Sequence, residues 1–136
     1  MHRHPLLSFL LGSLLSVVTL AAPVPTRDQL VAADYQKGRM AFLQRCSACH
    51  TLADGGSSLV GPNLWGVIGR RAGTIPGFAS SPALRSAGFK WDVGHVWEFL
   101  AGPETLIPGT RMLIPEPVPE GERTALVSFM MLETGA

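Results

Sequence analysis

The sequence predicts a small all-α domain. Apolar side chains recur at three- and four-residue spacing in three stretches, whereas no stretch alternates apolar and polar residues as a strand does. Glycine and proline are frequent between the three stretches, with 15 and 11 copies in 136 residues. We therefore expect one small domain of helices joined by long loops, without a sheet.

Residues 1–21 have the form of a secretory signal peptide. Arg3 precedes an unbroken run of apolar and small residues at 6–20, which is too short for a membrane span. Thr19 and Ala21 place small residues where a signal peptidase reads them, so we expect cleavage after Ala21, or alternatively after Ala22. An uncleaved N-terminal anchor is the competing interpretation. Both place the domain outside the cytoplasm, in the periplasm if the organism is a bacterium.

Residues 22–33 are expected to form a short proline-containing leader, and residues 34–133 the folded domain. The first helix of that domain should begin near Ala32 or Asp34 and end at Cys46, because apolar residues recur at near-helical spacing there. They are Tyr35, Met40, Ala41, Phe42 and Leu43.

Gly38 interrupts this helix, where a glycine costs roughly 1 kcal/mol relative to alanine unless something packs closely against it. Four residues later Phe42 provides a ring to fill a helix crossing. We expect the last helix to pack here through Leu126 and Phe129.

Two further helices are predicted in the C-terminal half. One starts at Asp92, a favourable N-cap residue, and stops at Gly102-Pro103. The other runs from about Pro119 to Glu133. The residues expected to face inward are Val93, Val96, Trp97, Phe99 and Leu100 in the first, and Leu126, Val127, Phe129 and Met130 in the second.

The five residues Cys46-Ser47-Ala48-Cys49-His50 carry the chemistry. Two cysteines three positions apart and an adjacent histidine are what covalent haem attachment requires, because each thiol adds across one haem vinyl group and the imidazole then binds the iron. A thioredoxin-like site is disfavoured because these cysteines follow a helix instead of opening one. A zinc site would need more ligands than His2, His4 and His95 supply.

Charge and cysteine content exclude several functions. The chain has 11 Lys+Arg and 10 Asp+Glu, and removal of Arg3 with the signal peptide leaves 10 of each. A neutral surface gives no support for binding nucleic acid or anionic membranes. With both cysteines used by haem, none remains for a disulfide framework.

The second axial ligand of the iron has five candidates, Met40, Met112, Met130, Met131 and His95. Three of the methionines lie within predicted helices, where core packing explains them. His95 lies in the first turn of a helix, usually a solvated position. Met112 differs because it ends a Pro-Gly turn, which can lay a thioether over the haem face opposite His50.

From about Gly38 to Met130 the chain resembles the class I cytochromes c, the mitochondrial type in particular. The resemblance is carried by Gly38-x-x-x-Phe42, Cys46-x-x-Cys49-His50, Gly61-Pro62-Asn63-Leu64, Gly69-Arg70, Pro76-Gly77-Phe78, Trp91 and Ile107-Pro108-Gly109-Thr110-Arg111-Met112, all in family order. It implies the class I cytochrome c fold around one covalent haem c, with His50 and Met112 as axial ligands.

The resemblance also implies roles for residues around the haem. The Pro62 carbonyl would accept the free ring N–H of His50. Arg70 and Trp91 resemble the donors to a buried haem propionate, and Thr110 lies in the methionine-bearing motif. Phe99 stands where the family often has a tyrosine that meets the ligand sulfur, so that hydrogen bond should be missing. Ser80 and Leu84 likewise replace a tyrosine and an asparagine, which predicts a less polar haem pocket.

A six-coordinate haem leaves no open site for substrate, so we expect an electron carrier without catalytic residues. Its partners would be redox proteins that dock on a small apolar patch at the haem edge, including Ala48, since the chain has only Lys37 and Lys90 as lysines. A dedicated cytochrome subunit of a periplasmic dehydrogenase is the main alternative, and a gas-binding or peroxidase-like haem protein is a third. The protein would accordingly be a monomer or part of a hetero-complex.

Overall fold

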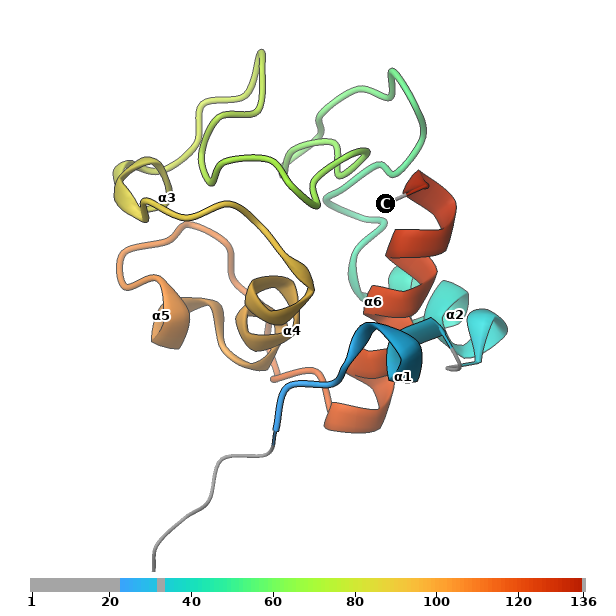
Figure 1. Ribbon diagram of the computed structural model, residues 1–136. Coiled ribbons are helices and arrows are strands. Elements are labelled where there is room, and N and C mark those ends of the chain that lie inside the picture. Colours follow the sequence, from blue (N-terminus) through green and yellow to red (C-terminus); the bar gives the residue numbers. More distant parts are fainter. Residues whose placement is uncertain (1–22, 32–33, 136) are drawn as a thin grey trace, which may run out of the picture.

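The structure, a computed structural model, describes residues 23–31 and 34–135 (Figure 1). Within these ranges it contains helices and a single isolated β-bridge, between Arg71 and Lys90, so the all-α prediction is confirmed. The predicted signal peptide lies outside the described residues. The helices are α1 (Arg27–Val31), α2 (Tyr35–Arg45), α3 (Pro82–Ser86), α4 (Val93–Ala101), α5 (Pro103–Leu106) and α6 (Glu120–Thr134).

Helices α2 and α6 cross closely because Gly38 has no side chain. A Cβ atom at Gly38 would lie 2.7 Å from Phe129 Cβ and closer still to the Ala125 carbonyl oxygen. Around the crossing the Phe129 ring lies 5.8 Å from the ring of Phe42 and 5.2 Å from that of Tyr35. The predicted pairing of Gly38 with the last helix is therefore confirmed.

Helix α4 starts and stops where the sequence predicts. The Asp92 carboxylate accepts a hydrogen bond from the His95 backbone N–H at 2.7 Å, and Gly102 is the C-cap. Pro103, expected to end the helical region, is instead the first residue of α5. Proline is favourable there because the first residues of a helix have no use for a backbone N–H donor. Pro103 therefore explains both the end of α4 and the start of α5 directly after it.

Removal of the α4 cap should destabilise the protein. Burial alone would raise the pKa of the Asp92 carboxyl, but hydrogen bonds from the backbone and ring of His95 outweigh burial and hold the pKa below its ordinary 3.8. The stabilisation is therefore complete above pH 3.8 and is lost as the pH falls through the lower, folded-state pKa. We expect Asp92→Ala to cost about 1 kcal/mol of unfolding free energy at pH 7 in denaturant titrations, and Asp92→Asn much less. Equal losses in the two variants would contradict a capping role.

The expected leader is partly helical. Helix α1 begins with a reciprocal pair, in which the Thr26 N–H donates to Gln29 Oε1 at 2.8 Å and the Gln29 N–H donates to Thr26 Oγ1 at 3.4 Å. In Figure 1 the helix lies in front of α6, which it contacts. Upstream of it, Val24 lies against Gly94 at the start of α4. Residues 23–31 thus form a strap across α4 and α6.

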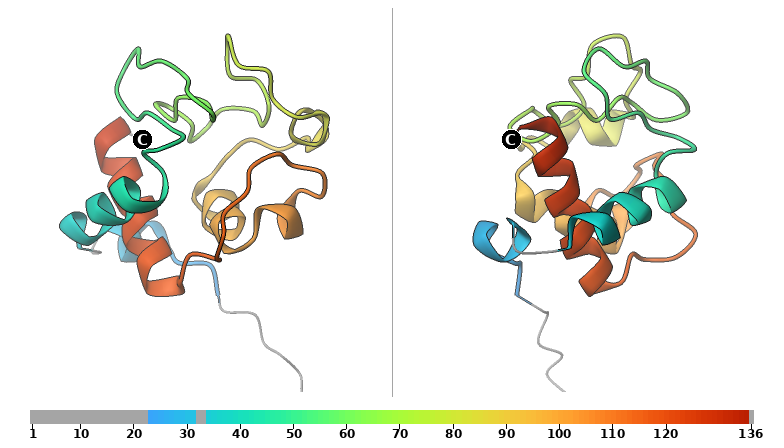
Figure 2. Two further views of the ribbon diagram at one scale, coloured as in Figure 1. Left: turned by 180° about the vertical axis from the view of Figure 1, so that it is seen from behind. Right: turned by 90° about the vertical axis from the view of Figure 1, so that its right-hand side faces the viewer.

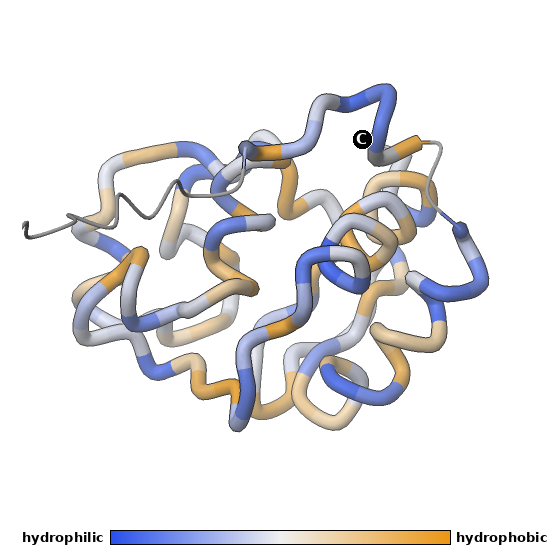
Figure 3. The backbone as a smooth tube through the Cα atoms, turned by 90° about the horizontal axis from the view of Figure 1, so that it is seen from below, coloured by the Kyte–Doolittle hydropathy of each residue, from blue (hydrophilic) through white to orange (hydrophobic). Residues whose placement is uncertain are grey.

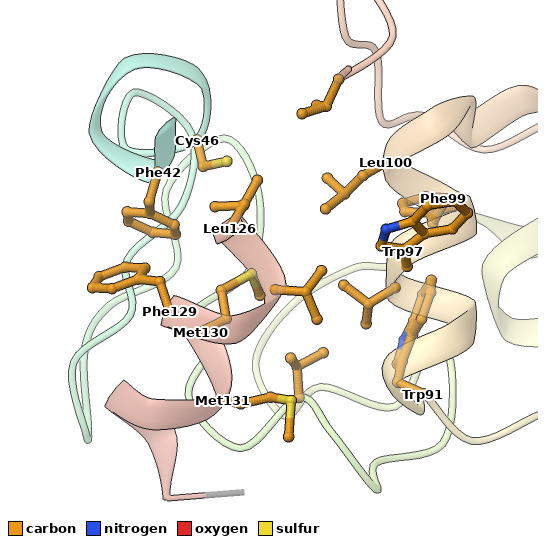
Figure 4. Packing of buried hydrophobic residues seen from close by; sticks show 14 of the residues in the cluster. Phe42, Cys46, Trp91, Trp97, Phe99, Leu100, Leu126, Phe129, Met130 and Met131 are labelled. Atoms are coloured by element: carbon orange, nitrogen blue, oxygen red, sulfur yellow. The ribbon is translucent and has the colours of Figure 1, made fainter. Parts of the chain in front are cut away.

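The core lies between two walls. Figure 4 shows side chains of α2 and α6 on one side, and α4 with the preceding Trp91 on the other. Leu126 and Val127 are completely buried, whereas Met40 and Leu43 of α2 are 47% and 46% exposed, contrary to the expectation that they pack inside. Only part of the apolar spacing in α2 therefore faces the core. The buried residues of this helix are Gly38, Ala41 and Phe42.

Hydrophobic and hydrophilic residues are mixed along the chain (Figure 3). Among the described residues, none of the helices has the length and apolarity needed to cross a membrane.

Candidate haem-binding site

The two cysteines and the histidine lie in one turn at the end of α2. Cys46 is the C-cap of that helix, and its carbonyl accepts hydrogen bonds from the N–H groups of Cys49, at 3.0 Å, and His50, at 2.8 Å. Cys46 is buried, Cys49 is half-buried, and both thiols are free. The local backbone therefore holds all three reactive side chains together without help from distant segments.

Cys46 lies in apolar surroundings. Burial raises the pKa of its thiol to about 11, with the opposing charge of Arg45 too weak to prevent this. A thiolate would be unfavourable here, but a thioether carries no charge and loses nothing on burial. The position therefore suits a thioether sulfur, which is bonded to carbon on both sides and carries no charge.

The ring of His50 is oriented by the Gly61–Pro62 segment. His50 Nδ1 lies 2.8 Å from the Pro62 carbonyl oxygen, where the ring N–H donates, and this leaves Nε2 free. A Cβ atom at Gly61 would come within 2.6 Å of Nε2 and 2.7 Å of Nδ1, so only glycine fits beside the imidazole. Burial lowers the pKa of His50, opposed by the Pro62 hydrogen bond. A neutral, oriented imidazole is the form that binds a metal ion.

The loop that carries Met112 is held by three local hydrogen bonds. The Thr110 N–H donates to the Ile107 carbonyl at 3.1 Å, and the buried Thr110 hydroxyl accepts from the Met112 N–H at 3.3 Å. Glu104 of α5 accepts from the Gly109 N–H at 3.0 Å, and Gly109 has a φ of 84°, which favours glycine. Met112 itself is half-buried and packs against the core.

The other candidate ligands are placed elsewhere. Met130 and Met131 are buried in α6, 5% exposed each, as core residues, whereas Met40 faces solvent. His95, expected at a solvated position, is half-buried. Its ring stacks on Phe89 with centroids 4.1 Å apart, and Nδ1 lies 2.8 Å from Asp92 Oδ1. Packing accounts for Met130 and Met131, contacts with Phe89 and Asp92 account for His95, and Met40 lies on the exposed side of α2.

The structure brings Arg70 and Trp91 together. The backbone N–H of Trp91 donates to the Arg70 carbonyl at 2.8 Å, and Arg70 Nη2 donates to the Trp65 carbonyl at 3.1 Å. The Trp91 ring is buried against Phe99, with centroids 5.1 Å apart. The two residues predicted to meet a propionate thus lie on neighbouring segments that are hydrogen-bonded through the backbone.

Ser80 is 4% exposed, and its hydroxyl is buried without a partner among the described residues. Its neighbour Ala79 accepts a hydrogen bond from Arg111, beside Met112. An unpaired buried hydroxyl is unfavourable unless a ligand supplies the missing partner. A haem propionate is such a partner, and with it the residues present fit the haem implied by the cysteine and histidine pattern.

Sequence reasoning gave no role to the side chain of Asn63. Its Nδ2 donates to Thr51 Oγ1 at 2.6 Å and to the Ala53 carbonyl at 3.0 Å, and its Oδ1 accepts from the Trp65 N–H at 2.8 Å. Asn63 therefore fixes the segment that carries Pro62 against the segment that follows His50. The only signal was its place in the Gly61-Pro62-Asn63-Leu64 motif.

A helical cradle with two free cysteines and an oriented histidine in one turn has the form of a c-type haem protein. No family model matches the chain. Known proteins do. It is 36% identical to cytochrome c of Stellaria longipes over 101 residues, 74% of this chain and 94% of that protein. It is 39% identical to cytochrome c 2.1 of Caenorhabditis briggsae over 102 residues, 75% and 90% of the two chains.

A third relative, cytochrome c type-1 of Ascaris suum, is 37% identical over 97 residues, 71% of this chain and 86% of that protein. The chain belongs to the cytochrome c family. It accordingly binds one covalent haem c, and its relatives are electron carriers.

Proposed function

We propose that this cytochrome c is an exported carrier of single electrons, with its haem attached through Cys46 and Cys49 and its iron bound by His50 and Met112. The observation that carries the proposal is the His50 ring, which the Pro62 carbonyl and Gly61 fix with Nε2 free. Export to the periplasm is supported by the signal-like pattern of residues 1–21.

The haem, when bound, supplies an iron that changes oxidation state by one electron. The chain's part is to keep the surroundings of that iron constant in both states. The Pro62 carbonyl holds the imidazole of His50, and Thr110 and Glu104 shape the loop that would bring Met112 to the opposite side of the iron. A histidine and a thioether together favour the reduced iron and raise its reduction potential.

The pocket also has to accept the charge of the propionates. Arg70 and Trp91 would donate to one of them, and the Ser80 hydroxyl, which has no partner among the described residues, would be a further donor. Phe99 contributes only apolar surface, since it has no hydroxyl to offer the sulfur of Met112. The pocket is therefore less polar than one with tyrosines at 80 and 99, and little rearrangement of hydrogen bonds would accompany a change of charge.

Spectra of the holoprotein made with export in a bacterium test this function. We expect low-spin haem in both oxidation states, an iron–sulfur charge-transfer band in the oxidised state, and no reaction with carbon monoxide. The mass of the same sample should equal the chain after cleavage behind Ala21 or Ala22 plus one covalently bound haem. High-spin haem, or carbon monoxide binding, would contradict a six-coordinate carrier, and an uncleaved chain in the membrane would contradict the export of a soluble protein.

A further inference from the structure

The loop that follows His50 is closed by hydrogen bonds that centre on the side chain of Asn63. Both views of Figure 2 show the chain after α2, drawn in green, folding back on itself in loops. Asn63 Nδ2 donates to Thr51 Oγ1 at 2.6 Å and to the Ala53 carbonyl at 3.0 Å. Thr51 Oγ1 in turn donates to the Ser57 carbonyl at 2.6 Å. We call the side chains of Asn63 and Thr51, joined in this way, the Asn63 clasp.

The Asn63 clasp is closely packed. A Cβ atom at Gly56 would lie 2.5 Å from Asn63 Nδ2, and 3.0 Å from both Thr51 Oγ1 and the Ala53 carbonyl oxygen. Even the smallest side chain at residue 56 would therefore displace the Asn63 amide group. Close packing thus holds this amide group in place together with its hydrogen bonds.

Backbone hydrogen bonds join the chain on both sides of His50 to residues 61–64. The Gly61 N–H donates to the Cys49 carbonyl at 2.8 Å. The Leu64 N–H donates to the Thr51 carbonyl, also at 2.8 Å. These two bonds set the register between the segments, and the Asn63 clasp lies on the Thr51 side of it.

The clasp controls the direction of the Pro62 carbonyl through a shared peptide unit. The Pro62 carbonyl, which lies 2.8 Å from His50 Nδ1, is in the same planar peptide unit as the nitrogen and Cα atoms of Asn63. A second bond holds this unit, because the Asn63 N–H donates to Ser58 Oγ at 3.2 Å. Any rotation that turns the carbonyl away from His50 would therefore also move Asn63 and strain the clasp.

Given the proposed ligation of iron by His50, we infer that Asn63 is a positioning residue that holds the Pro62 carbonyl against His50 Nδ1 in both oxidation states and so lowers the reduction potential. An imidazole whose ring N–H has an acceptor is a more basic ligand and favours the oxidised iron. The Asn63 clasp accordingly opposes part of the rise in potential that the thioether of Met112 would cause.

Thr51→Val tests this role, because it removes the hydroxyl of the clasp at similar volume. The bond from the Trp65 N–H to Asn63 Oδ1 remains, as does the Trp65 carbonyl that accepts from Arg70, so the change is confined to the His50 side. In NMR spectra of the reduced holoprotein, the His50 Nδ1 proton should exchange with water about fivefold faster. The reduction potential of this variant should rise. Asn63→Ala removes the whole clasp and should speed the exchange by at least about tenfold.

Thr74→Val is the matched control. Thr74 Oγ1 donates to the Arg71 carbonyl at 2.8 Å in a different loop, so this variant loses the same kind of bond but should leave both the Nδ1 exchange and the potential at their wild-type values. Thr51→Val with reduced stability, but with unchanged exchange and potential, would overturn the inference, because the clasp would then only support the loop. Wild-type spectra are recorded first. High-spin haem or carbon monoxide binding would overturn the proposed function and this inference with it, whereas unchanged variants of a low-spin protein overturn the inference alone.

Discussion

Replacing Met112 by alanine is expected to abolish the iron–sulfur charge-transfer band and to lower the reduction potential. Without the thioether the oxidised iron loses a ligand that favours the reduced state, and axial ligands alone move haem potentials over roughly 0.8 V. The freed position should also bind carbon monoxide in the reduced state. Near-infrared spectra, redox titration and carbon monoxide difference spectra measure the three effects.

Met40→Ala is the control for this prediction. Met40 lies on the exposed side of α2, so its removal should change neither spectrum nor potential. If Met112→Ala kept the charge-transfer band, another methionine would be the ligand, and the loop 107–112 would have a purely structural role. His95 would not replace it, because its ring stacks on Phe89 and its Nδ1 lies against Asp92.

Replacing Gly38 by alanine is expected to lower the unfolding free energy by about 3 kcal/mol. The new Cβ would meet the backbone carbonyl of Ala125 and the Cβ of Phe129, which cannot move without α6, so the two helices would have to separate. Separation would also loosen the packing of Phe42 on Phe129. Denaturant titration of the holoprotein, followed by far-ultraviolet circular dichroism and haem absorbance, would measure the loss.

Gly121→Ala is the matched control, because it is also a helical glycine but a Cβ there would meet only the end of the Lys37 side chain, at 3.7 Å. Alanine is the better helix former by up to about 1 kcal/mol, so this variant should be as stable as the wild type or more so. A destabilisation of similar size in both variants would mean that the loss at Gly38 does not come from the helix crossing.

Predictions from the sequence succeeded where the physical cause is local. The Asp92 cap, the Gly102 stop and the turn from Cys46 to His50 depend on residues within a few positions of one another, and the structure has them where expected. They failed where a distant segment decides. Met40 and Leu43 continue the apolar spacing of α2, but α6 covers only part of that helix, so both remain exposed. No sequence pattern near residue 27 indicates that α1 packs against α6.

The candidate site divides in the same way. The sequence by itself was enough to predict haem attachment at Cys46 and Cys49, because residues 46–50 contain both the bond-forming groups and their spacing. The contact between the Pro62 carbonyl and His50 Nδ1 was expected from the resemblance and is confirmed. Only the tertiary structure decided that Trp91 meets Arg70 and that Ser80 is buried without a partner among the described residues. The two hydrogen bonds join residues 12 and 21 positions apart in the chain, and their geometry depends on how the loops pack around the core, which no local pattern specifies.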